Sequence, residues 1–182
     1  MKTLEPPDSH HLNAAVGWIE LGNALEAFDE LELISPDSWF HPDVLVVRWV
    51  IYAKARKWDI ALQIAQAVVS IAPERPMGWI SLAYSLHELN RTQDAWQELL
   101  SVAERFPQNG AIQFNLACYA CKLGKMDEAK TWLARSIEVA GREKIVRRVV
   151  NRPDLQPLWN QLGPTSSAAP NAAGRVSFSV PS

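Results

Sequence analysis

The chain has 182 residues, a formal net charge of −2 and an apolar fraction of 48%. A chain of this length and composition can bury a core without covalent staples, which excludes a disordered chain, a collagen-like chain and a disulfide scaffold. The near-neutral charge argues against a dedicated nucleic-acid binder. No apolar run typical of a signal peptide or of a membrane span occurs, so we expect a cytoplasmic protein that does not bind membranes.

Four alanines recur at a constant spacing of 34 residues, at positions 27, 61, 95 and 129. Each is preceded and followed by apolar residues at helical spacing, and Gly22, Asn90 and Gly124 stand between the two stretches, where a tight helix exit needs a left-handed residue. This register divides the chain into an extension over 1–7 and four repeats. The repeats cover 8–143, as 8–41, 42–75, 76–109 and 110–143. We expect one helix pair in each, near 8–35, 42–71, 76–105 and 110–140.

The first two repeats depart from this pattern. In the first, Pro36 comes three residues early, and Trp39 stands where the terminal proline is expected, so its second helix should end short. The second repeat has Arg56 at its turn. It also pairs a large Trp49 with a small Ala65, an exchange that keeps the core volume roughly constant.

A cap and a tail follow the fourth repeat, which ends in Gly141 instead of proline. The segment 142–151 is basic and amphipathic and predicts a capping helix. A short apolar hook is predicted after it, formed by Leu155, Leu158 and Trp159. The capping helix and the hook are assigned to 144–162. Residues 163–182 are small and polar, so we expect a disordered tail.

The third repeat carries a family pattern most fully: Trp79, Leu82, Ala83, Leu86, Asn90, Ala95, Leu99, Val102 and Pro107. It resembles the tetratricopeptide repeat (TPR), and the chain resembles small stand-alone bacterial TPR proteins. The resemblance implies an all-α, right-handed α-solenoid of four helix pairs with a capping helix. It also implies a non-catalytic protein–protein interaction scaffold without a cofactor.

In this family the first helix of each repeat lines a concave, partner-binding groove. The resemblance places in it Leu12, Val16, Ile19, Val46, Val50, Ala53, Ile80, Tyr84, His87, Phe114, Cys118 and Cys121, with Glu88, Lys122 and Arg148 at the rim. These positions are mostly apolar, so we expect an amphipathic or extended apolar segment there, from another protein or from a second copy. Tyr84 and Phe114 are the expected anchors. The carboxylate clamp of some chaperone-binding relatives is not expected.

Two alternatives remain open. Cys118 and Cys121 form a C-x-x-C pattern that, with His87, suggests a metal- or thiol-dependent protein. Against this, no strand is expected near the motif, and two small side chains also suit a helix packed in a groove. The other alternative is a chaperone for secreted proteins, because small TPR chaperones look similar.

Charge and tryptophan patterns give two further expectations. Residues 1–47 hold nine acidic residues and one Lys, whereas residues 48–182 hold eleven acidic and seventeen basic residues. This asymmetry can steer a charged partner or another copy, although solvated helix faces also differ by accident. The basic cap lacks interleaved aromatic residues, so no nucleic-acid partner is expected. Trp18, Trp49 and Trp79 fall at repeat spacing and are assigned to packing.

Overall fold

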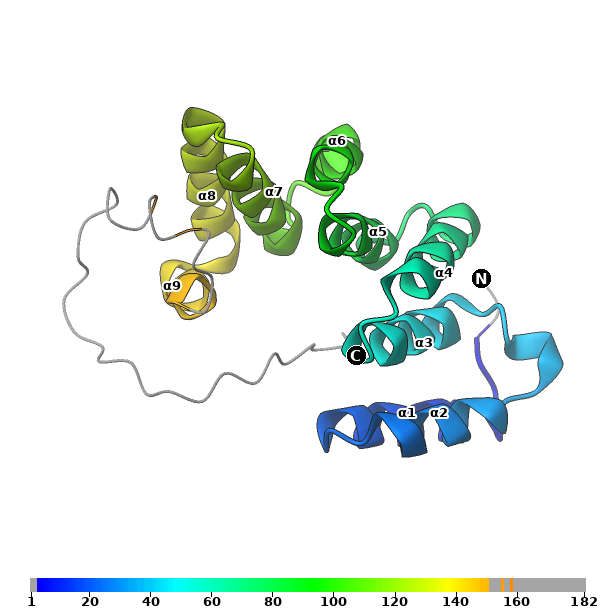
Figure 1. The fold of residues 1–182 in the computed structure, drawn as a ribbon. Helices are drawn as coiled ribbons and strands as arrows, with labels where there is room; N and C mark the ends of the chain where they lie inside the picture. Colours follow the sequence, from blue (N-terminus) through cyan, green and yellow to red (C-terminus); the bar gives the residue numbers. More distant parts are fainter. Residues whose placement is uncertain (1–2, 151–154, 156–157, 159–182) are drawn as a thin grey trace. The chain divides into compact units, whose positions relative to one another are not determined.

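The computed structural model describes residues 3–150, together with 155 and 158. All regular elements within these residues are helical, which confirms the all-α fold class (Figure 1). The chain divides into two compact units, residues 1–102 (unit 1) and 103–182 (unit 2), which are described separately.

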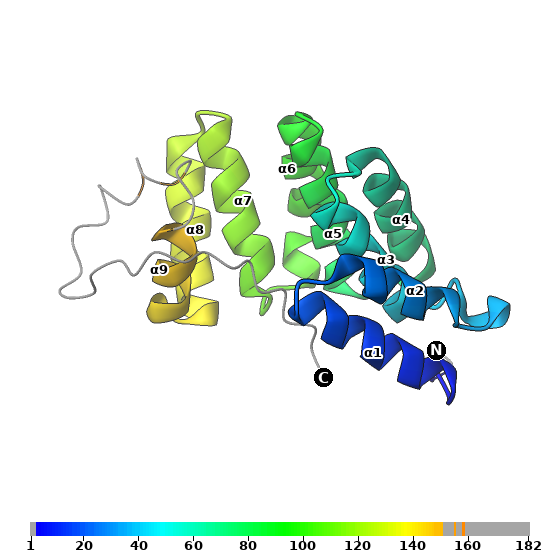
Figure 2. The ribbon, with the colours of Figure 1, turned by 60° about the horizontal axis from the view of Figure 1, so that its bottom comes forward.

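The helices follow the expected pairs closely. Unit 1 contains α1 (Asp8–Glu20), α2 (Ala24–Glu32), a 3-10 turn η1 (Pro36–Ser38), α3 (Pro42–Lys54), α4 (Trp58–Ile71), α5 (Pro76–Glu88) and α6 (Thr92–Val102). Unit 2 contains η2 (Ala103–Arg105), α7 (Gly110–Lys122), α8 (Met126–Ala140) and α9 (Arg142–Val150). Figure 2 shows α1 and α2 side by side as the first pair.

Local chemistry sets the helix ends. Pro42 and Pro76 occupy first-turn positions, where the missing N–H costs no hydrogen bond. The Asn109 side chain caps α7 by accepting hydrogen bonds from the N–H groups of Ala111 and Ile112. The second, third and fourth repeats therefore begin where the sequence supplies a helix start.

All four turns within the repeats use a left-handed residue. Gly22 and Gly124 have φ of 84° and 76°, and the equivalent Arg56 and Asn90 have φ of 55° and 61°. Arginine adopts this region at a cost of about 1–2 kcal/mol, whereas glycine adopts it without strain. The second repeat therefore keeps the turn geometry despite its unfavourable side chain.

The repeat alanines lie inside the helix packing. Ala27, Ala61, Ala95 and Ala129 are all fully buried, as the 34-residue register predicts. Trp49 and Ala65 are also fully buried.

Two glycines allow close approach of helices. A Cβ at Gly78 would lie 2.9 Å from Val68 Cγ1 on α4, and one at Gly110 would lie 2.8 Å from Ala140 Cβ on α8. Because atoms this close would clash, both contacts require a residue without a side chain.

The first repeat differs from the others at its second helix. As the early Pro36 predicts, α2 is only nine residues long. The connection that follows is tied back to the start of α1, because the Ser35 N–H and hydroxyl both donate to the Asp8 carboxylate. These bonds, with the Ser35 side chain contributing most, lower the pKa of Asp8. Trp39 closes the connection by donating from Nε1 to the Ile34 carbonyl at 2.8 Å.

The cap lies on the last helix pair of unit 2. Ile145 and Val149 of α9 are buried, and so are Leu155 and Leu158 from the expected hook. Trp159 and the expected disordered tail 163–182 lie outside the described residues. The described helices are all too short or too polar to cross a bilayer.

Candidate functional site

The first helix of each repeat carries the expected groove residues. In the first repeat, Leu12, Val16 and Ile19 lie on one side of α1 and are half-buried. Each also packs against the core formed around Ala15 and Leu31, so their exposed surface is backed by fixed neighbours. This stretch of α1 presents an apolar surface that a ligand can reach.

The second repeat contributes much less accessible surface. Val46, Val50 and Ala53 of α3 are all buried. They sit in the helix that lies between α1 and α5, because α3 contacts both within unit 1. These α3 residues therefore pack beneath the surface, and a ligand could reach little of them.

The third repeat contributes α5, its first helix, which carries Tyr84. Ile80, Tyr84 and His87 of α5 are half-buried, and Glu88 is exposed. His87 Nδ1 lies 2.9 Å from the Thr92 hydroxyl, which holds the ring at the end of α5.

Tyr84 belongs to a cluster of three rings. Its ring centroid lies 6.2 Å from Trp49 in an edge-to-face arrangement and 5.7 Å from Trp58 in a tilted one. Trp49 is fixed in turn, because its Nε1–H donates to the Ser85 hydroxyl at 2.9 Å. The sequence indicated Tyr84 and Trp49 separately, but it gave no sign that Trp58 joins them.

The expected groove residues of unit 2 are mostly inaccessible. Phe114 is only 4% exposed, and Cys118 is fully buried. The Arg148 guanidinium lies over the Phe114 ring, 5.0 Å from its centroid. Phe114 is therefore a covered core residue and not the open anchor expected from its place in the repeat.

The remaining unit 2 positions are more open. Cys121 is half-buried, with Sγ 4.0 Å from Met126 Sδ, while Lys122 and Arg148 are exposed. Neither cysteine forms a disulfide with a residue that the structure describes. Within the described part of the chain, His, Cys, Asp and Glu side chains form no group of three or more that could hold a metal ion.

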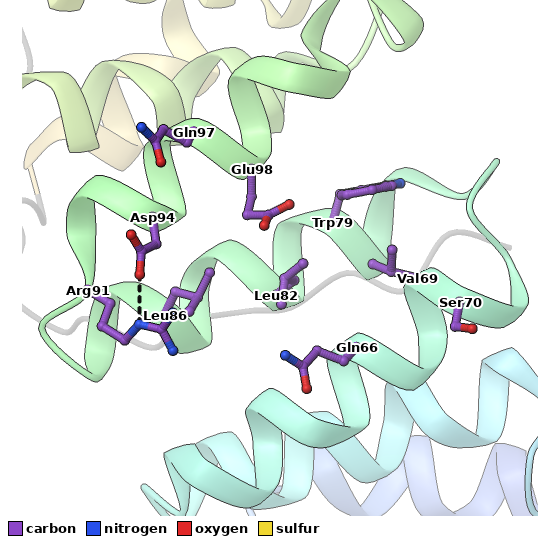
Figure 3. A pocket seen from close by; sticks show the side chains of 10 residues that line it. All are labelled: Gln66, Val69, Ser70, Trp79, Leu82, Leu86, Arg91, Asp94, Gln97 and Glu98. Carbon is purple, nitrogen blue, oxygen red and sulfur yellow. Dashed lines mark hydrogen bonds and ion pairs between the residues drawn. The ribbon is translucent and has the colours of Figure 1, made fainter.

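A pocket in unit 1 lies between the second helices α4 and α6 and is also lined by the first helix α5. It has a volume of about 500 Å³ and is lined by α4, α5 and α6 (Figure 3). Trp79, Leu82 and Leu86 supply its apolar lining, and Arg91 pairs with Asp94 at 2.7 Å on its rim. Trp79 was assigned to packing. It is half-buried, lines this pocket and donates from Nε1 to the Pro73 carbonyl.

Solved structures with similar architecture identify the fold. TTC0263 is a thermophilic TPR protein from Thermus thermophilus. It matches with a TM-score of 0.72 and 17% identity, covering 86% of this chain and 83% of its own. The chain has a tetratricopeptide-repeat fold. PilF of Pseudomonas aeruginosa matches this TPR fold with a TM-score of 0.68 and 16% identity, covering 87% of this chain and 78% of its own. MamA AMB-1 matches with a TM-score of 0.58 and 18% identity, covering 85% of this chain and 91% of its own.

Comparisons of the sequence with family models and curated proteins give no match. No protein-family model matches the chain. No curated protein matches its sequence significantly. Because identity to the solved TPR structures is below 20%, these similarities establish the fold alone.

Proposed function

We propose that this TPR chain is a non-catalytic scaffold that binds an apolar or amphipathic peptide segment along the first helices of unit 1. The carrying observation is the row of half-exposed apolar side chains on α1 and α5, backed by buried residues of α3. TPR folds typically serve as protein–protein interaction scaffolds, which agrees with this proposal.

The chemistry of the row favours an apolar ligand. Leu12, Val16 and Ile19 have no polar group to offer, and Ile80 adds a fourth aliphatic side chain. Tyr84 supplies a large ring whose position is set by Trp49 and Trp58. A ring that is already ordered loses little side-chain entropy on binding, so Tyr84 is the anchor of the proposed site.

A peptide selection tests this proposal. Twelve-residue peptides selected on the full-length chain from a random displayed library are synthesised, and their affinity is measured by calorimetry. Tyr84→Ala should weaken binding by about 30-fold, the effect of a typical aromatic anchor of about 2 kcal/mol. Gln97→Ala, on the exposed side of α6, is the matched control and should bind as the wild type does.

The same peptides distinguish the first helices from the basic cap. Melting temperatures of both variants show whether the fold is intact. Binding that survives Tyr84→Ala but is lost in Arg147→Glu/Arg148→Glu would place the ligand on α9 and contradict the proposal.

A further inference from the structure

The outer surface of α2 carries two large, exposed apolar side chains. Leu25 is 70% exposed and Leu33 is 61% exposed. At 100° per residue, Leu25, Glu26, Asp29, Glu32 and Leu33 lie within an arc of about 120°, opposite the buried Ala27 and Leu31. We refer to these five residues as the α2 outer face.

The other repeats provide an internal comparison for this surface. The positions equivalent to Leu25 are Asp59, Gln93 and Asp127, and all three are exposed and polar. Those equivalent to Leu33 are Ala67, Ser101 and Arg135. The Leu25 position is therefore exposed in every repeat. The Leu33 position is exposed in three repeats, and in the second repeat Ala67 is half-buried against Leu45, Val46 and Val68. Only the first repeat has leucine at both positions.

A residue after the same helix follows this pattern. Phe40 is 69% exposed, and its equivalents are Glu74, Gln108 and Arg142. Single exposed apolar residues are ordinary, but one repeat here has three large, exposed apolar residues, and eight of their nine equivalents in the other repeats are polar, with Ala67 the exception. Such a concentration points to an interaction surface.

The charges around the leucines indicate the kind of partner. Glu32 pairs with Arg48 at 3.3 Å, whereas Glu26 and Asp29 form no ion pair with any residue that the structure describes. The first 47 residues contain a single Lys against nine acidic residues. Anionic lipid and nucleic acid would be repelled by these carboxylates, and a basic segment would be attracted.

We propose that the α2 outer face is a second docking site, separate from the first-helix surface, and that it binds a basic amphipathic helix of a protein partner. The apolar side of such a helix would cover Leu25 and Leu33, and its Lys or Arg side chains would pair with Glu26 and Asp29. A nine-residue helix is about 13.5 Å long, which accommodates two to three turns of the partner.

The test uses an 18-residue fluorescein-labelled helix of leucine and lysine, and the same peptide with glutamate in place of lysine. Fluorescence anisotropy with the full chain measures both affinities. We expect the lysine peptide to bind more tightly than the glutamate peptide, because only the lysine peptide can pair with Glu26 and Asp29. The variant Leu25→Gln/Leu33→Ser, which installs the residues of the third repeat, should raise its Kd at least tenfold. Glu26→Gln/Asp29→Asn should raise its Kd at low salt, and the difference should vanish at high salt.

A graft on α6 controls for simple adhesion to exposed leucine. Gln93→Leu/Ser101→Leu, added to Leu25→Gln/Leu33→Ser, should not restore binding. On α6, Arg91 already neutralises Asp94, and Gln97 stands where α2 has Asp29. Restoration would mean non-specific adhesion and would overturn the proposal.

Other results would also overturn it. Failure of the lysine peptide to bind the wild type would do so, and so would equal binding of both peptides. Loss of binding in Tyr84→Ala would assign the peptide to the first-helix surface. A wild-type dimer in sedimentation that Leu25→Gln/Leu33→Ser dissociates would identify a second copy as the occupant. Because Tyr84→Ala leaves the expected result unchanged, the two proposals fail independently.

Discussion

Overpacking at Ala95 tests the register on which the whole repeat assignment depends. Ala95 is fully buried in α6, which packs on α5. Ala95→Leu adds three carbon atoms at a position without exposed surface. Overpacking of this kind costs about 1–3 kcal/mol of unfolding free energy. For a chain of this size, 1 kcal/mol corresponds to about 2–4 °C, so the melting temperature should fall by about 2–12 °C.

The matched control places the same side chain outside the core. Gln93 lies in the same helix and is exposed, so Gln93→Leu should change stability by no more than about 0.5 kcal/mol. Circular dichroism at 222 nm, followed against temperature and urea, measures both variants. If Ala95→Leu melts with the wild type, or if Gln93→Leu costs as much, then position 95 is not the crossing point of the pair and the register is wrong.

Three further predictions concern the turn, the aromatic core and the first connection. Arg56→Gly should raise the unfolding free energy by about 0.5–1 kcal/mol, because relief of the left-handed arginine exceeds the added chain entropy of glycine. Urea titration measures this, and a destabilised variant would contradict it. Trp49→Ala should cost about 3–5 kcal/mol in the same assay. Trp49→Phe should cost less, because phenylalanine keeps a ring in the core and leaves a smaller cavity, and Ser85 still donates its hydrogen bond to the Ser81 carbonyl. Since folding lowers the pKa of Asp8, its contribution to stability is present above the unfolded pKa and is lost as the pH falls through the folded value. Asp8→Asn should therefore lose less stability than the wild type between pH 6 and pH 3, and parallel pH profiles would refute this.

The helix boundaries could be predicted from the sequence because local chemistry sets them. Pro42 and Pro76 start helices by their own backbone geometry, and Gly22 and Gly124 end them in the same way. The short α2 likewise follows from the position of Pro36. Each of these signals acts within one turn of the residue that carries it.

The accessibility of the site residues depended on distant contacts and could be predicted only in part. The repeat pattern indicates that position 114 faces the groove side of α7, but it does not show that Arg148, from α9, covers the ring. In the same way, Trp58 reaches Tyr84 from a different helix. The pocket beside Trp79 also requires three helices to be placed at once.

The leucines of α2 are a different case, because their signal was present in the sequence. When the four repeats are aligned on their alanines, Leu25 falls at the same position as Asp59, Gln93 and Asp127. A comparison of outward positions between repeats, in addition to the inward ones that define the family, would have identified them. Internal repetition thus supplies a reference for surface residues as well as for the core.

The different exposure of the two thiols of α7 allows local unfolding of unit 2 to be measured by thiol labelling. Cys118 is fully buried and Cys121, less than one turn away, is half-buried. A thiol reagent should label Cys121 in the native state and reach Cys118 only when α7 separates from its neighbours. When reclosing is faster than labelling, the ratio of the Cys118 rate to that of an unfolded thiol gives the equilibrium constant of that opening. Following the ratio in urea would show whether α7 opens alone or only when the whole unit unfolds.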